Sequence, residues 1–139
     1  MDLSELLRAT YAMFRPPKAR TVSEWADENR VLVSESSSEP GPWRTDRAPY
    51  QREIMDAFTQ PGVYEIVVMA SAQVGKSEIE LNMLGRAIDN DPGPMLYVQP
   101  TDKVAEDYSK RRIAPMFAAC PTLRDKVFKA KGRDAANTI

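Results

Sequence analysis

The spacing of apolar and polar side chains predicts a largely helical chain. In residues 3–14, LSELLRATYAMF, apolar side chains recur every three or four positions, which is typical of a short amphipathic helix. Pro16 and Pro17 end this helix because proline has no amide hydrogen to donate. Comparable spacing predicts helices within four further stretches, residues 21–29, 48–62, 76–89 and 101–119.

Two of these helices carry start signals. Thr21 is followed three residues later by Glu24, which predicts a reciprocal capping box in front of a helix that carries Trp25. Thr101 is a candidate N-cap, and the acidic Asp102 follows it near the positive end of the helix dipole. We therefore expect helices that begin close to Thr21 and Thr101.

Two apolar runs predict strands. Residues 63–69, VYEIVVM, and 95–100, MLYVQP, are short, apolar and preceded by turn residues. Val67, Val68 and Met69 are consecutive, which predicts burial on both faces, as in a parallel sheet. Strand, loop, helix, strand and helix in this order is the pattern of a βαβ unit, so the expected fold class is α/β.

Composition narrows the chemistry. The chain has 139 residues, of which 42% are apolar and 28% charged, the balance of one globular domain. Cys120 is the single cysteine and histidine is absent, which excludes a disulfide framework, a cysteine zinc site and histidine-based triads. We expect Cys120 to be buried. No apolar run reaches membrane-spanning length and no leader pattern opens the chain, so we expect no membrane segment.

Charge is unevenly spread along the chain. The net charge is −1, but residues 121–139 hold five basic and two acidic side chains, a net +3 that leaves −4 for the rest. Such a basic tail is either a solvated face or a contact for a phosphate backbone.

Residues 70–77, ASAQVGKS, lie between the first predicted strand and the next helix, and they match the pattern G-x-x-x-x-G-K-[ST] except at its first position. In that pattern main-chain amides bind phosphate oxygens, the lysine reaches the β- and γ-phosphates, and the final hydroxyl binds Mg²⁺. The expected ligand is ATP with Mg²⁺, and Ser77 is the candidate metal ligand. The candidate nucleotide-binding residues are Ala70, Ser71, Ala72, Gln73, Val74, Gly75, Lys76 and Ser77.

Ala70 is the departure from this pattern. Alanine is compatible with such a loop only if the backbone there is not left-handed, because a Cβ atom makes that conformation costly. The alternative is an ordinary turn that contains a surface lysine. With the loop, the expected fold becomes α/β with a partial P-loop NTPase-type parallel sheet, flanked by helices and preceded by short amino-terminal helices.

Tyr50 and Gln51 lie about twenty residues before the loop, at the start of a predicted helix. A glutamine amide offers one donor and one acceptor to the edge of adenine, and an aromatic ring can cover the face of the base. The pair is therefore a candidate adenine site. The alternative is that Tyr50 belongs to the core.

Hydrolysis of ATP needs a carboxylate that holds Mg²⁺ and a group that orients the attacking water, normally after a later strand. No apolar strand ending in Asp-Glu follows residues 95–100. We therefore expect a chain cut short before these carboxylates, which binds nucleotide at most and has no catalytic residue of its own.

Several segments together resemble the large terminase subunit of lambda-type tailed bacteriophages. They are, in order, FRPP, TVSEWADENRVL, EPGPWRTDRAPYQREIMDAF, VVMASAQVGKSE and YVQPTDKVAEDYSKRRIAP. The resemblance runs from about Phe14 to the end of the chain and covers only the beginning of that family's protein. Its most specific parts are Glu-Trp-Ala-Asp at 24–27, Gly-x-Trp at 41–43 and Gln-Pro-Thr-Asp at 99–102.

The resemblance implies a DNA-packaging motor with an amino-terminal ATPase domain and a carboxy-terminal nuclease, active in the host cell cytoplasm. It implies that residues 1–20 form a helix and linker that meet the small terminase subunit, and that residues 21–139 are the first part of the ATPase domain. Viral double-stranded DNA, the portal or prohead, and further copies of the chain are the other implied partners. Gln73 stands where such loops often carry a basic residue that acts as an arginine finger in cis.

Two other functions fit the residues. The first is a non-catalytic interaction module, in which the 3–14 helix and the basic tail bind a packaging partner or DNA. The second is a fragment of a helicase-like ATPase, a class that shares a glutamine upstream of the loop.

Overall fold

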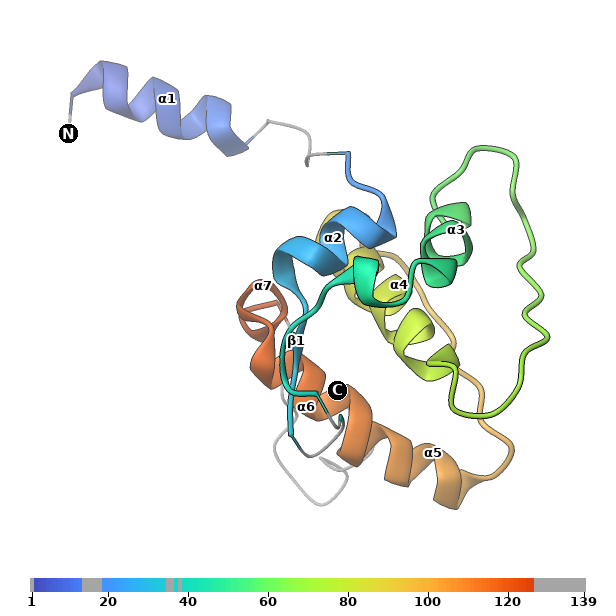
Figure 1. The fold of residues 1–139 in the computed structure, drawn as a ribbon. Coiled ribbons are helices and arrows are strands. Elements are labelled where there is room, and N and C mark those ends of the chain that lie inside the picture. The colour runs from blue at the N-terminus through green and yellow to red at the C-terminus, as the bar shows by residue number, and fades with distance from the viewer. Residues whose placement is uncertain (1, 14–18, 35–36, 38, 127–139) are drawn as a thin grey trace.

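The computed structural model describes residues 2–13, 19–34, 37 and 39–126, which form a helix-rich α/β arrangement (Figure 1). The helices are α1 (Leu3–Met13), α2 (Val22–Asn29), α3 (Tyr50–Ala57), α4 (Lys76–Asn90), α5 (Asp102–Tyr108), α6 (Ala114–Ala119) and α7 (Pro121–Arg124). The shorter elements are the strands β1 (Val31–Leu32) and β2 (Gly41–Pro42), the short 3₁₀-helix η1 (Thr45–Arg47) and the short π-helix η2 (Ser109–Ile113). Each predicted helix is confirmed, and η2 joins α5 to α6.

Both predicted start signals are confirmed. The Thr21 hydroxyl accepts a hydrogen bond from the Glu24 amide at 3.3 Å, and the Glu24 carboxylate accepts one from the Thr21 amide at 3.0 Å. This is the reciprocal capping box, and it satisfies two amides that the helix itself leaves unpaired. Thr101 caps α5 in a simpler way, since its hydroxyl accepts from the Val104 amide.

The core lies where α2, α3, α4, α6 and α7 meet. Its largest fully buried side chains are Trp25, Met55, Leu81, Met116 and Leu123, and the predicted burial of Cys120 is confirmed. On α4, a Cβ atom at Gly85 would lie 2.2 Å from the Trp25 ring. Glycine at this position therefore lets the indole approach the backbone of α4 closely. An indole of this size buries about 150–250 Å², which makes it a large contribution to the core.

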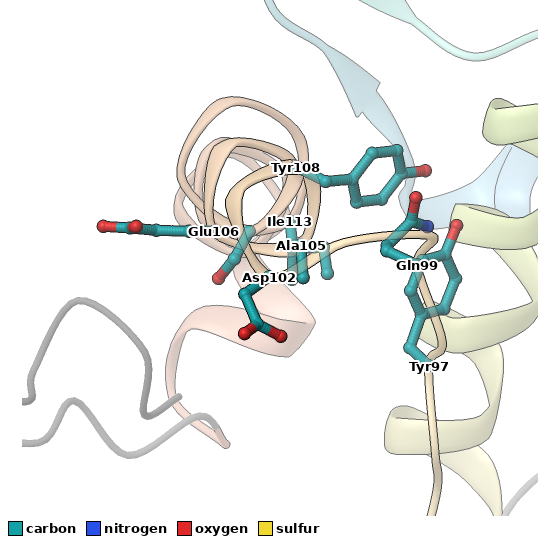
Figure 2. A pocket seen from close by; sticks show the side chains of 8 residues that line it. Tyr97, Gln99, Asp102, Ala105, Glu106, Tyr108 and Ile113 are labelled. Carbon is teal, nitrogen blue, oxygen red and sulfur yellow. The ribbon is translucent and has the colours of Figure 1, made fainter.

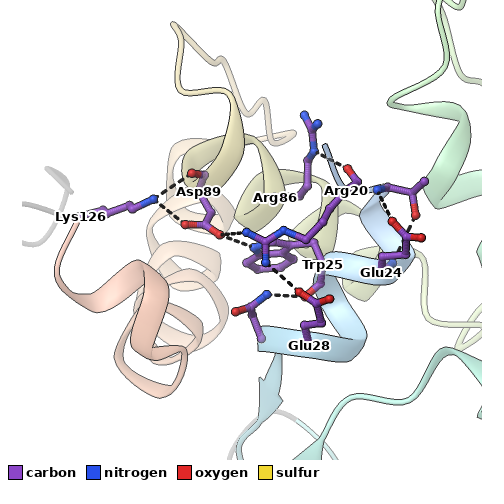
Figure 3. Close-up of polar contacts among 9 residues, drawn as sticks. Arg20, Glu24, Trp25, Glu28, Arg86, Asp89 and Lys126 are labelled. Carbon is purple, nitrogen blue, oxygen red and sulfur yellow. Dashed lines mark hydrogen bonds and ion pairs between the residues drawn. The ribbon is translucent and has the colours of Figure 1, made fainter. Parts of the chain in front are cut away.

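Asp89 gathers the polar contacts at the carboxyl end of α4 (Figure 3). Its carboxylate accepts a hydrogen bond from the Trp25 indole at 2.9 Å and pairs with Arg20 and Lys126. Arg20 also pairs with Glu28 of α2 at 2.9 Å. A carboxylate with 7% of its side chain exposed is tolerable only when it is paired in this way. The cluster fastens the segment before α2 and Lys126, the second residue after α7, to the end of α4.

The two strands predicted within 63–69 and 95–100 are absent from the structure, which is a correction. Both segments lack strand pairing, and Tyr64, Met69 and Leu96 are 98%, 99% and 89% exposed instead of buried. The reason is that a strand needs a hydrogen-bonded neighbour, which periodicity cannot supply. In the described part of the chain the sheet consists of β1 and β2, paired antiparallel with Val31 opposite Pro42 and Leu32 opposite Gly41, and this pair was not predicted.

Helix α1 projects away from the other helices (Figure 1). Its apolar side chains are exposed, Leu3 at 70% and Tyr11 at 74%. The basic tail falls mostly in residues 127–139, outside the described residues, as do residues 14–18 between α1 and α2. Among the described residues, no helix combines the length and apolar character needed to cross a bilayer.

Candidate functional site

The 70–77 loop follows the segment 63–69 and includes the first two residues of α4, Lys76 and Ser77. Among the described non-glycine residues only Gln73 has a positive φ, at 61°, so the backbone at Ala70 is not left-handed. The condition under which alanine is compatible with the loop is therefore met. The left-handed conformation falls instead on Gln73 and Gly75.

Gly75 is fixed as glycine by two separate constraints. Gly75 is the N-cap residue of α4. Its φ is +83°, a backbone conformation that residues with a side chain rarely adopt. In addition, a Cβ atom there would lie 2.4 Å from the side-chain nitrogen of Gln51. The loop therefore passes closely over Gln51 at the point where the helix begins.

The start of α4 is open to an anion. No side chain caps this helix, in contrast to α2 and α5, which are capped by Thr21 and Thr101. The amides of Glu78 and Ile79 donate to the Gly75 carbonyl, whereas amides ahead of them at a helix start have no intrahelical acceptor, and the helix dipole adds partial positive charge there. The Lys76 ammonium lies over the same loop, donating to the carbonyl of Ala70 at 3.2 Å and to that of Ser71. Amides and ammonium thus converge on one loop.

Tyr50 and Gln51 meet the loop from α3. The Tyr50 hydroxyl and the Gln51 amide nitrogen both donate to the Val74 carbonyl, each at 3.0 Å. Gln51 is buried, whereas Tyr50 is 59% exposed and so is not a core residue. The remaining oxygen of the Gln51 amide is buried without a hydrogen-bond partner among the described residues. Two residues chosen from the sequence as an adenine site therefore lie against the loop chosen as a phosphate site.

An ionic cluster around Glu78, in the first turn of α4, was not predicted. Arg30, at the end of α2, has 2% of its side chain exposed and pairs with Glu78 at 2.8 Å. Glu78, in the first turn of α4, pairs with Arg112 of η2 through its other oxygen at 3.2 Å. Arg30 also donates to Asn82, one turn further along α4, at 3.2 Å. No motif or spacing connects positions 30, 78 and 112, so no sequence signal marks the cluster.

Two tyrosines, Tyr97 before α5 and Tyr108 at its end, contact α4, and these too were missed. The rings of Tyr97 and Tyr108 stack with centroids 5.3 Å apart. Tyr97 donates to the Glu80 carboxylate, and Tyr108 donates to the Ser77 carbonyl at 3.5 Å. Burial raises the pKa of Tyr97, and the hydrogen bond to Glu80 raises it further. Burial likewise raises the pKa of Tyr108.

Beside these tyrosines lies an open pocket of about 390 Å³ (Figure 2). Tyr97, Gln99 and Tyr108 face one another on one side of it, whereas Asp102 and Glu106 point away from them. Glu106 is already paired with Lys110 on the same helix. The two carboxylates therefore do not converge on a common point.

The described residues contain no group of three or more acidic, histidine or cysteine side chains that could hold a metal ion. Magnesium in nucleotide sites is often held by only one or two protein oxygens, together with phosphate oxygens and waters. The hydroxyl of Ser77, at the start of α4, fits that limited requirement.

Known proteins resemble this chain along most of its length. The family described as phage terminase large subunit gpA, ATPase domain, matches residues 37–139. The chain is 34% identical over 121 residues to the large terminase subunit of Escherichia phage lambda, and 30% identical over 125 residues to that of Enterobacteria phage P21. These alignments cover 87% and 88% of this chain but 19% of each relative. No solved structure matches.

The match to an ATPase domain agrees with a loop of this kind at a helix start. The chain belongs to the family of phage terminase large subunits and corresponds to part of their ATPase domain. It spans about a fifth of the length of the relatives that it matches.

Proposed function

We propose that this chain forms the nucleotide-binding beginning of the ATPase in a viral DNA-packaging motor. One observation carries the proposal: Tyr50 and Gln51 of α3, together with the loop's own Lys76, all donate hydrogen bonds to carbonyls of the 70–77 loop at the uncapped start of α4. The ligand proposed is ATP with Mg²⁺. The family match supports ATP as the nucleotide, since the matched domain is an ATPase.

Each residue has a role in this proposal. Amides of residues 70–77 bind phosphate oxygens, and Lys76 leaves the loop carbonyls to reach the β- and γ-phosphates. Ser77 provides the hydroxyl ligand for Mg²⁺, which neutralises phosphate charge when bound. The exposed Tyr50 ring covers the adenine face, and the Gln51 amide is assigned to the adenine edge, which requires this buried amide to turn outward when nucleotide binds.

The wider assignment follows from the family. We propose that residues 1–20 contact the small terminase subunit and that residues 21–139 begin an ATPase domain of the P-loop type. In the host cell cytoplasm the assembled motor, with several copies of the chain, moves viral double-stranded DNA through the portal into the prohead. The chain alone has no catalytic residue assigned, so we expect it to bind ATP without hydrolysing it.

Titration of a fluorescent ATP analogue with Mg²⁺ tests the proposal. Lys76→Ala should weaken binding at least tenfold, because the ammonium is the principal fixed charge on the loop. Lys103→Ala makes the same change at an exposed lysine of α5 and should alter the affinity less than twofold. Equal and negligible binding by all three proteins would reject the nucleotide site. Steady phosphate release that Lys76→Ala abolishes would reject only the lack of hydrolysis.

A second function has its own support in α1. This helix leaves Leu3, Leu6, Leu7 and Tyr11 exposed, which is an apolar face without a cover in the described structure. In the interaction-module alternative, this face binds a packaging partner and the loop binds nothing. Negligible nucleotide binding together with retained binding of the small terminase subunit would favour that alternative.

A further inference from the structure

We infer that Arg30 and Arg112, acting through Glu78, are positioning residues that fix the 70–77 loop for phosphate binding. We name these three residues the Glu78 clamp. The inference deepens the proposed function and rests on it for the identity of the ligand. None of the three residues belongs to the loop or to the adenine site.

The geometry of the clamp is specific. Glu78 follows Lys76 and Ser77 directly, and its amide donates to the Gly75 carbonyl at 3.0 Å. Its side chain accepts from Arg30 through one oxygen and from Arg112 through the other. The first turn of α4 is therefore held from two sides, by the end of α2 and by η2. A turn held in this way cannot rotate or fray without breaking an ion pair.

Arg30 is placed to bear most of this restraint. Its side chain is 2% exposed, and every group it contacts is fixed by secondary structure: Glu78 and Asn82 on successive turns of α4, and the Val31 carbonyl in β1. A buried guanidinium that lost its carboxylate would be left as an uncompensated charge. Breaking the contact between Arg30 and Glu78 would therefore cost free energy, which keeps the two side chains in this arrangement.

The charges of the clamp also suit an anion site. An unpaired carboxylate in the first turn of α4 would repel phosphate groups bound at the same helix start. With two guanidinium groups against one carboxylate, the clamp carries a net charge of +1 instead. Arg112 additionally lies in the short π-helix η2, and short π-helical segments are frequent at functional sites.

The matched control lies at the other end of the same helix. Arg20, with 17% of its side chain exposed, pairs with Asp89 near the carboxyl end of α4. Arg30→Met and Arg20→Met thus make the same chemical change at opposite ends of one helix. A general loss of stability would affect both variants, whereas loss of loop positioning would affect only Arg30→Met.

Amide hydrogen exchange and binding of a fluorescent ADP with Mg²⁺ test the clamp in the 139-residue chain. Arg30→Met should raise the exchange rate of the Glu78 and Ile79 amides at least tenfold, after correction for any change in the rate of amides that exchange only through global unfolding. It should also weaken nucleotide binding at least tenfold. Arg20→Met should change both quantities less than twofold. Changes below twofold in Arg30→Met as well would overturn the inference.

A double variant separates positioning from support of the fold. Arg30→Met/Glu78→Met replaces the ion pair by apolar side chains, a change that often restores stability. We expect the melting temperature to recover while fast exchange and weak binding persist; recovery of all three would overturn the inference.

If the wild-type chain binds no better than Lys76→Ala, the proposed function fails, and the exchange rates still decide whether the clamp holds the loop.

Discussion

Gly75 and Ala70 show how unequal two positions of one loop can be. The sequence pattern treats both as glycine positions, yet a left-handed backbone is found only at the second. Tyr50 and Gln51 were selected from the sequence by their distance from the loop and do contact it. Arg30 could not be predicted from the sequence, because its role depends on Glu78, which is 48 residues away in the chain. Only the packing of α2 on α4 brings the two residues together.

Gly75→Ala should damage the site severely. A left-handed conformation costs a residue with a Cβ atom about 1–2 kcal/mol, and the close contact with Gln51 adds to that. We expect a lower melting temperature and at least tenfold weaker nucleotide binding. Gly93→Ala is the control, because a Cβ atom at Gly93 meets nothing within 4 Å and its effect should stay within about 0.5 kcal/mol. Equal effects at the two positions would contradict this account.

Ala70→Gly, which restores the glycine of the general pattern, should bring no gain. The backbone at Ala70 is not left-handed, so glycine relieves no strain there. Glycine instead makes the unfolded chain more flexible, which should lower the free energy of unfolding by about 0.4–1 kcal/mol. Chemical denaturation and nucleotide titration measure the two effects. A tenfold gain in affinity would show that alanine does impair the loop.

Helices were predictable as elements, and strands were not. A helix satisfies its backbone internally, so the periodicity of 21–29 and the cap at Thr21 contain most of the needed information. A strand is completed by a neighbour, and the apolar residues of 63–69 say nothing about where that neighbour lies. The pair β1–β2 was not predicted because each strand has only two residues, which is too short for a periodic pattern.

The contact between α4 and the segment before α5 should weaken in alkali. The pKa of Tyr97 is raised above its ordinary value of 10.0 in the folded chain, so folding favours the protonated phenol. The stability that this provides is complete below about pH 10 and is lost as pH rises further. Denaturant unfolding between pH 8 and 11 should show that loss, and Tyr97→Phe should reduce its slope. Tyr64→Phe, at a 98% exposed ring, is the control and should keep the wild-type slope.

At the scale of the whole molecule, the exposed apolar side chains of the described residues outside α1 are concentrated in residues 63–69 and 95–98. Val67 and Leu96 are 82% and 89% exposed, and exposed apolar segments of this kind favour association between molecules. We expect the chain to bind a hydrophobic dye and to associate as its concentration rises.

Val67→Lys or Leu96→Lys should reduce both effects while changing the free energy of unfolding by less than about 0.5 kcal/mol. Val104→Lys, at a less exposed valine of α5, is the control and should leave dye binding near the wild-type level. Light scattering and dye fluorescence provide the measurements. A large loss of stability in Val67→Lys would show that the segment is packed in solution.

The Asp89 cluster has a mechanical consequence. Arg20, which precedes α2, and Lys126, which follows α7, both pair with this one carboxylate. Tension pulling these two residues apart would therefore be borne first at the carboxyl end of α4. The 15 residues of that helix place the 70–77 loop about 20 Å from the point of strain. A chain stretched from both sides would thus yield far from the place where Lys76 lies.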